Sequence, residues 1–164
     1  MDPVTASVKI DRPREEVFEY LADIANHPEF SDHFLKEWRL TRVESYGRGA
    51  GARFKIDAPL DRFGWGDMTF IEVDRPHRIV AAGRAGKFNR NKTWTTWTLS
   101  PAGNATKVEV TTESEPALAT DKFMEAVTRR RGWYRRGLGK ALNRLQSILE
   151  EGMDRGARAT VGGL

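Results

Sequence analysis

The longest hydrophobic pattern of the chain lies near its C-terminal end and has the period of a helix. Apolar side chains recur there at steps of three, four or seven residues, which places them on one stripe of a 3.6-residue helix. The stripe consists of Met124, Val127, Tyr134, Leu138, Leu142, Leu145 and Leu149. It predicts one long helix over residues 121–150, capped by Thr120 or Asp121 and ended at Gly152. A helix with one apolar face needs a partner, and a curved sheet is the partner available.

The preceding residues alternate between apolar and polar side chains, which is the period of half-buried strands. The first such segment covers residues 4–10, and a short amphipathic helix over residues 13–23 and a helical turn over residues 29–35 follow it. Six further strands are predicted, over residues 38–44, 52–58, 65–73, 77–84, 92–99 and 106–113. Turn signals roughly every 8 to 15 residues indicate an antiparallel meander. The pattern predicts an α+β fold in one domain over residues 1–152, followed by a Gly- and Ala-rich, disordered tail over residues 153–164.

Composition and charge limit the classes of protein to which this domain can belong. A chain of 164 residues is long enough to bury a core in a single domain. It contains no cysteine, which excludes disulfides and thiolate metal sites and fits a cytoplasmic protein. No apolar run approaches about 18 residues and the first residues lack a signal-peptide pattern, so no membrane-spanning segment is expected. The net charge of +4 is concentrated in the predicted long helix, which contains eight Lys and Arg residues and three Asp and Glu residues.

Residues 8–30 have the sequence VKIDRPREEVFEYLADIANHPEF and contain a motif. Together with the order of the predicted strands and helices, this motif is informative about the fold. A strand ends in Ile-x-x-Pro (Ile10, Pro13), an amphipathic helix follows, and then comes Asp-x-x-x-x-Pro (Asp23, Pro28). This stretch resembles the helix-grip superfamily, which includes START lipid-transfer domains, the birch-pollen allergen family and the polyketide cyclase/dehydrase-like SRPBCC branch. The resemblance implies a seven-stranded antiparallel sheet wrapped round the long C-terminal helix, with two short helices after the first strand and a cavity between sheet and helix. It does not fix the chemistry, because one fold carries many functions.

The inward faces of the strands and the stripe of the helix supply the candidates for lining such a cavity. These candidate ligand-binding residues are Phe54, Ile56, Met68, Phe70, Glu72, Trp94, Trp97, Met124, Val127, Arg131, Tyr134 and Leu138. Because Trp94 and Trp97 are three residues apart on one strand, only one of them can face the interior. Ordinary core packing is the alternative for each residue. A pocket of roughly 300 to 1,000 Å³ suits a lipid, a polyketide or a quinone-like aromatic compound.

Arg131 is the one charged residue that interrupts the apolar stripe, four residues after Val127 and three before Tyr134. An arginine facing a cavity can hold an acidic ligand group with two parallel hydrogen bonds. Alternatively, Arg131 extends its head into solvent or pairs with an internal carboxylate such as Glu72. Three glycines nearby, at positions 132, 137 and 139, each weaken the helix by about 1 kcal/mol. They indicate a kink at the cavity mouth or a close approach of the helix to the sheet.

Motifs for catalysis, metals or cofactors are not visible in the sequence. His27 and His33 lie six residues apart, which is not a helical metal-ligand spacing, and no phosphate loop or dinucleotide fingerprint occurs. We therefore expect neither a metal nor a cofactor. Three functions compete: binding or carrying a hydrophobic or aromatic small molecule, an enzyme of the polyketide cyclase or aromatase type, and docking of the basic helix on an anionic membrane or nucleic acid. Nucleic acid is the least expected partner, because aromatic residues among the basic ones are limited to Trp133 and Tyr134.

Overall fold

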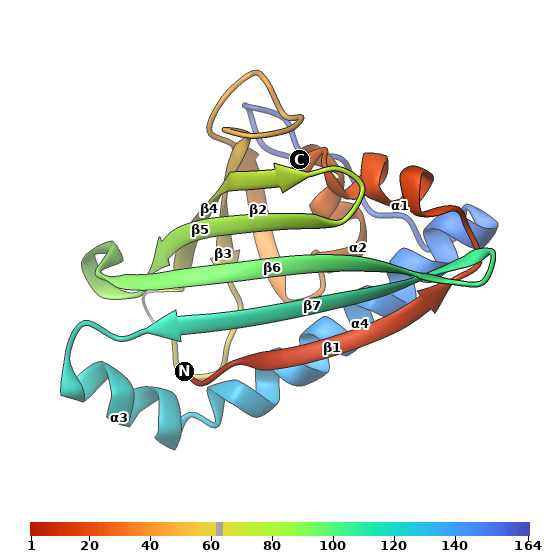
Figure 1. The fold of residues 1–164 in the computed structure, drawn as a ribbon. Coiled ribbons are helices and arrows are strands. Elements are labelled where there is room, and N and C mark those ends of the chain that lie inside the picture. Colours follow the sequence, from red (N-terminus) through yellow and green to blue (C-terminus); the bar gives the residue numbers. More distant parts are fainter. Residues whose placement is uncertain (62–63) are drawn as a thin grey trace.

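The computed structural model describes residues 1–61 and 64–164, and its strands form one antiparallel sheet. Seven strands lie in the order β1-β7-β6-β5-β4-β3-β2 within this described part of the chain. They are β1 (Val4–Ile10), β2 (Leu35–Leu40), β3 (Gly51–Ile56), β4 (Trp65–Asp74), β5 (Arg78–Ala85), β6 (Asn91–Ala102) and β7 (Ala105–Glu115). The helices are α1 (Arg14–Leu21), α2 (His27–Ser31), α3 (Ala119–Val127) and α4 (Arg130–Glu151), with 3-10 turns η1 (Ile24–Asn26) and η2 (Lys87–Asn89). The predicted helix-grip architecture is confirmed (Figure 1).

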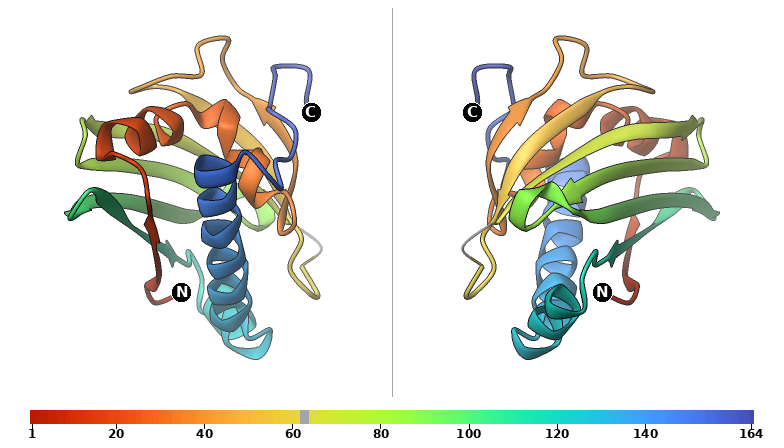
Figure 2. Two further views of the ribbon diagram at one scale, coloured as in Figure 1. Left: turned by 90° about the vertical axis from the view of Figure 1, so that its right-hand side faces the viewer. Right: turned by 90° about the vertical axis from the view of Figure 1, so that its left-hand side faces the viewer.

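The sheet curls round α4, which lies along its concave side (Figure 2). Helix α4 packs against β1 at one edge of the sheet and against α2, which continues the wall toward β2. The buried stripe of α4 contains Tyr134, Leu138, Leu142, Leu145 and Ile148. Burial of this stripe against the inward faces of the strands removes the apolar face of the helix from water, which stabilises the fold. No helix of the described residues is long and apolar enough to cross a bilayer.

The single helix predicted over residues 121–150 is broken in two. Helices α3 and α4 are separated at Thr128 and Arg129, and Arg129 has a left-handed backbone with φ 50° and ψ 37°. The Thr128 hydroxyl donates to the Met124 carbonyl (2.7 Å), and Val127 and Thr128 are both β-branched. Both features weaken helical continuation. The break resets the phase of the helix, so no residue of α3 is buried although its apolar residues fit the stripe of α4 by spacing.

Strand β2 begins three residues earlier than the predicted segment of residues 38–44. Its burial breaks the expected alternation, because Leu35 and Trp38 are both buried although they are three residues apart. The cause is a bulge between Lys36 and Arg39, where Glu37 adopts a positive φ of 51°. A bulge inserts one extra residue and so shifts which side chains face the core.

The tail of residues 153–164, for which the composition predicts disorder, runs back over α2 and β2 in the structure. The Gly156 amide donates to the Glu29 carbonyl (2.8 Å) and the Ala159 amide to the Ala25 carbonyl (2.9 Å). Ala159 is itself buried, and a Cβ on Gly156 would lie within 3.2 Å of Glu29 backbone atoms. The small side chains that suggest a disordered segment are therefore the ones that allow close packing here.

Candidate ligand-binding cavity

A cavity lies between the sheet, α2 and α4, and it continues into a hollow at the molecular surface. The inner cavity has a volume of about 70 Å³ and is bounded by residues such as Phe30, Trp38, Phe54, Trp97, Leu138 and Ala141. The outer hollow, here called the vestibule, has a volume of about 370 Å³ and is bounded by residues such as Pro59, Leu60, Lys87, Met124 and Trp133. Gly86, Asn91, Glu125 and Arg130 line both spaces, so the vestibule is the entrance to the inner cavity. The inner cavity alone is smaller than the roughly 300 Å³ expected of a ligand site, whereas the vestibule reaches this size.

The deep end of the inner cavity is formed by aromatic rings from four elements. His27 and Phe30 come from α2, Trp38 from β2, Phe54 from β3 and Trp97 from β6. Ring centroids lie 4.7 Å apart for Trp38 and Phe54, and 5.5 Å apart for His27 and Trp97, which meet edge to face. Rings at such separations form a stiff apolar wall whose faces and edges suit a further flat ring.

Two polar groups interrupt this aromatic wall. The Nε2 atom of His27 lies 2.8 Å from the Leu21 carbonyl, and because a carbonyl only accepts, Nε2 carries the proton. Burial lowers the pKa of His27 to about 4, so the ring is neutral near pH 7 and its Nδ1 is unprotonated. The second group is the indole Nε1–H of Trp97, which is buried and has no hydrogen-bond partner in the described part of the chain. A buried donor without an acceptor is costly to the free energy of folding.

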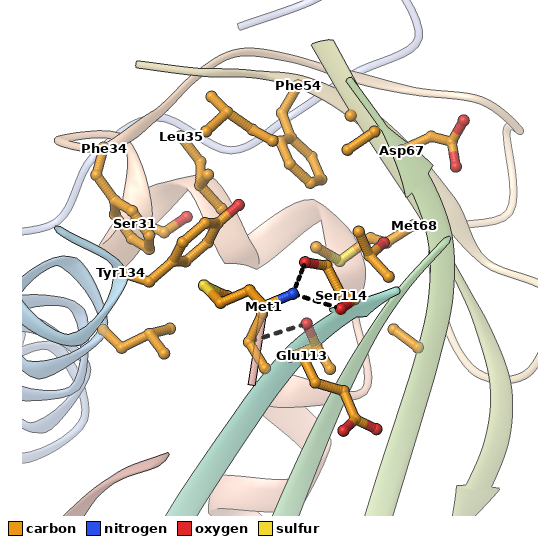
Figure 3. Close-up of a pocket in the computed structure, with 18 of the residues that line it drawn as sticks. Met1, Ser31, Phe34, Leu35, Phe54, Asp67, Met68, Glu113, Ser114 and Tyr134 are labelled. Carbon is orange, nitrogen blue, oxygen red and sulfur yellow. Dashed lines mark hydrogen bonds between the residues drawn. The ribbon is translucent and has the colours of Figure 1, made fainter. Parts of the chain in front are cut away.

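Arg130, Asp61 and Tyr134 form a polar cluster where the inner cavity meets the vestibule. Arg130 Nη1 lies 2.9 Å from Asp61 Oδ2, and its guanidinium lies 6.0 Å from the centre of the Tyr134 ring. Burial raises the pKa of Tyr134, so its hydroxyl keeps its proton. Burial alone would lower the pKa of Arg130, but Tyr134 and Asp61 offset this and the pKa lies above its usual value. The cavity entrance therefore holds a permanent cation beside a phenol, whose hydroxyl lies on the side of Leu35 and Phe54 (Figure 3).

A second polar cluster joins α3 to the end of β7. The Ser114 hydroxyl donates to Glu125 Oε1 (2.7 Å), and the amino group of Met1 lies 2.6 Å from Glu125 Oε2 and donates to the Ser114 carbonyl (2.6 Å). Figure 3 shows the contacts of Met1 with Ser114 at the edge of the cavity. The Glu125 carboxylate is thus occupied by groups of the protein and anchors α3 through its polar side.

Six of the twelve residues predicted to bind a ligand lie on the wall of the inner cavity. They are Phe54, Ile56, Met68, Trp97, Tyr134 and Leu138. Of the two tryptophans on β6, Trp97 faces inward and Trp94 does not line either space, as their spacing requires. Phe70 is buried in the core, with its ring centroid 5.6 Å from that of His27, and does not reach the cavity.

The remaining predicted residues lie outside the inner cavity. Glu72 is on the outer face of the sheet, where it accepts a hydrogen bond from Arg78 Nε (2.9 Å), so it is no internal partner for an arginine. Met124 lines the vestibule and Val127 is exposed, because the break before α4 turns α3 out of the stripe. Arg131 is exposed as well, and the prediction that it faces the cavity is wrong. Its neighbour Arg130 takes the inward position.

Several residues of the site were not predicted from the sequence. His27, Phe30 and Trp38 belong to the early helical segment and the bulged strand, and the alternation of the longer strands does not include them. His27 and Phe30 nevertheless lie inside the motif of residues 8–30. Asp61 lies on a loop, where periodicity carries no information. Among the described residues, no group of three or more His, Cys, Asp or Glu is arranged to hold a metal ion.

A seven-stranded sheet gripping a C-terminal helix, with a cavity between them, defines a helix-grip protein of the SRPBCC type. Residues 1–150 match the family described as polyketide cyclase / dehydrase and lipid transport, and the chain belongs to this family.

Solved structures of other proteins share the fold. The solution structure of the KanY protein has a TM-score of 0.73 at 19% identity and covers 90% of this chain and 97% of its own. Norcoclaurine synthase from Thalictrum flavum has a TM-score of 0.66 at 14% identity, with 92% and 94% covered. DynU16, from the dynemicin biosynthetic locus, has a TM-score of 0.59 at 20% identity, and the match covers 95% of this chain and 50% of DynU16. At these identities the likeness establishes the fold alone. No curated protein matches the sequence.

Proposed function

We propose that the protein binds a flat hydrophobic or aromatic small molecule in the inner cavity, with the remainder of the molecule extending into the vestibule. The observation that carries this proposal is a cavity with an aromatic deep end that shares the cation Arg130 with the adjoining vestibule. Ligand sites in proteins combine apolar walls with a few placed polar groups in this way. The family description, which includes polyketide and lipid compounds, supports the same class of ligand.

The polar groups of the cavity set the chemistry of the preferred ligand. The Nε1–H of Trp97 favours a carbonyl, ether or other acceptor at the buried end of the molecule. At the entrance, Arg130 favours an acidic or strongly accepting group, because a guanidinium binds such groups in a bidentate manner. A linear aromatic compound with acceptors at both ends satisfies both requirements.

The second candidate function is an enzyme of the polyketide cyclase type, and one observation favours it. A protonated phenol, Tyr134, and an unprotonated imidazole nitrogen, Nδ1 of His27, belong to the same cavity wall. Cyclisation of a polyketone requires a proton to leave one carbon and another to reach a carbonyl oxygen, so it needs a base and an acid. The low pKa of His27 makes this base weak, which ranks catalysis behind binding.

The proposal is tested with naphthalene-2-carboxylate as the probe in calorimetric titrations of the purified protein. Ala141, on the cavity wall, is replaced in Ala141→Phe to fill the cavity, and the exposed Ala157 provides the control Ala157→Phe. Binding at a stoichiometry near one that is lost in the first variant and kept in the second supports the proposal. Equal binding by both variants refutes it. Mass spectrometry of an organic extract of the protein identifies the natural ligand class, and a product formed from it on incubation favours the enzyme.

A further inference from the structure

Helix α3 is amphipathic, but it turns its polar side to the protein and its apolar side to solvent. Two acidic residues hold it in place: Asp121 accepts from Arg90 Nε (2.8 Å) and Glu125 accepts from the Ser114 hydroxyl (2.7 Å). Phe123 and Val127, which are four residues apart and so share a face, are 67% and 57% exposed. This orientation is the reverse of a helix that packs on its own core.

The segments next to α3 add further exposed apolar side chains around the vestibule. Leu60 and Phe88, from the loop after β3 and from η2, are 80% and 83% exposed. Phe88 also has a positive φ of 59°, an unfavourable backbone conformation for a bulky residue, and such conformations are concentrated at functional sites. We call the whole set the mouth patch, and it consists of Leu60, Phe88, Leu118, Phe123, Met124 and Val127. In the right-hand view of Figure 2, both η2 and α3 face the viewer at this end of the molecule.

The exposed side chains of α3 and the first turns of α4 carry positive charge. Between residues 119 and 136 the exposed charged side chains are Lys122, Arg129, Arg131, Arg135 and Arg136. The two acidic residues of this stretch are half-buried and already paired with Arg90 and Met1. Exposed Lys87 stands beside Phe88 and extends the positive region to the other side of the vestibule.

We propose that the mouth patch docks on an anionic phospholipid bilayer and presents the vestibule to it. Apolar side chains on a helix rimmed by Lys and Arg bind at such an interface, because the side chains enter the acyl boundary while the cations neutralise headgroups. A second copy of the chain is disfavoured as the occupant, since it would bring two arginine-rich segments together. Nucleic acid would leave the exposed apolar side chains without a role, because its backbone is bound by polar and charged groups. Docking is independent of which compound the cavity binds.

The test is co-sedimentation of the full chain with vesicles of phosphatidylcholine, with and without phosphatidylserine. We expect binding to the phosphatidylserine vesicles and weaker binding at high salt, because salt screens exposed charges. Phe88→Ser combined with Phe123→Ser should reduce the affinity at least tenfold, since each removes a large apolar group from the interface. Val43 is also 83% exposed but lies in the turn after β2, so Val43→Ser is the matched control and should bind as the parent does.

A charge-matched pair of variants tests the electrostatic part. Arg129→Gln with Arg131→Gln should lower the affinity about fivefold for each arginine removed. Arg42→Gln with Arg48→Gln changes the net charge equally in exposed residues after β2 and should have little effect.

Several outcomes overturn the docking proposal. These are no sedimentation with phosphatidylserine vesicles, equal losses in the Val43 or Arg42/Arg48 controls, and binding of duplex DNA in preference to vesicles. A dimer in analytical ultracentrifugation that disappears with Phe123→Ser would identify a second copy as the occupant instead. Calorimetry with naphthalene-2-carboxylate in the absence of vesicles reports on the cavity separately. Vesicle binding can therefore fail while the cavity still binds the probe, and probe binding can fail while vesicle binding is kept.

Discussion

Replacing Arg130 with methionine tests the assignment of the inward-facing cation. The guanidinium is 2.9 Å from Asp61 Oδ2, and the two side chains are 18% and 11% exposed. Removing one partner of a fully buried pair costs about 3 to 5 kcal/mol because the other charge stays buried. The partial exposure of this pair reduces the expected loss in the free energy of unfolding to about 2 kcal/mol. For a chain of this length, such a loss lowers Tm by about 4 to 8 °C.

Arg131→Met is the matched control, because it makes the same chemical change one residue further along the helix. Arg131 is exposed, so its replacement should change the free energy of unfolding by less than about 0.5 kcal/mol. In the double variant Arg130→Met/Asp61→Asn, much of the loss should be recovered, since neither charge remains. Thermal and urea unfolding of the four proteins measure these differences.

The same variants separate a ligand-binding role of Arg130 from a purely structural one. Naphthalene-2-carboxylate should bind Arg130→Met about tenfold more weakly, whereas the neutral carboxamide of the same shape should bind equally well. Arg131→Met should bind both compounds as the parent does. If Arg131→Met loses stability and carboxylate affinity while Arg130→Met keeps both, the phase assigned to α4 is incorrect.

Two further predictions concern α2 and the middle of α4. Burial holds the pKa of His27 at about 4 against 6.5 in the unfolded chain. The unfolded state alone therefore gains a proton between these values, and stability falls by up to about 3 kcal/mol as the pH is lowered from 6.5 to 4. His27→Gln should remove this part of the pH dependence. Urea unfolding at several pH values measures the free energy of unfolding, and the same fall with pH in the variant as in the parent would contradict the prediction. Gly137→Ala should destabilise by about 1 to 3 kcal/mol, because its Cβ would lie 2.6 Å from Phe34 Cδ2. Gly139→Ala meets nothing within 4 Å and should stabilise by about 1 kcal/mol, so equal Tm shifts would refute the distinction.

Alternation along the chain predicts the strands well wherever a regular strand has one buried face. Strands β3 to β7 begin and end within a few residues of their predicted bounds, and Trp97 rather than Trp94 faces inward as the period requires. The prediction fails at β2, where the bulge at Glu37 places two buried residues three apart. A bulge depends on backbone geometry and on the partner strand, and neither can be obtained from the period of one segment.

The interior wall of the cavity was predicted only in part, because some of it comes from segments with no long period. His27 and Phe30 lie on the five-residue helix α2, which is too short for a periodic signal. Asp61 reaches Arg130 from a loop more than 60 residues earlier in the chain, so their pairing is a property of the tertiary structure. The glycines of the helix predicted a close approach of another segment, and Gly137 does mark one. The segment that approaches is Phe34 after α2 rather than the sheet.

The left-handed residue Arg129 explains why the apolar face of α3 points outward, and it makes Arg130 and Arg131 the first residues of α4. In one unbroken helix, the stripe through Met124 and Val127 would continue to Arg131 and Tyr134, and all four would face the sheet. The left-handed backbone of Arg129 restarts the helix, so Tyr134 and Leu138 keep the inward direction while Met124 and Val127 lose it. Counted back from Tyr134, Arg131 at three residues and Arg130 at four both fall near this inward face, and the structure turns Arg130 toward Asp61. A single left-handed residue therefore leaves the apolar face of α3 at the surface, and residue spacing alone cannot show this because it treats the helix as continuous.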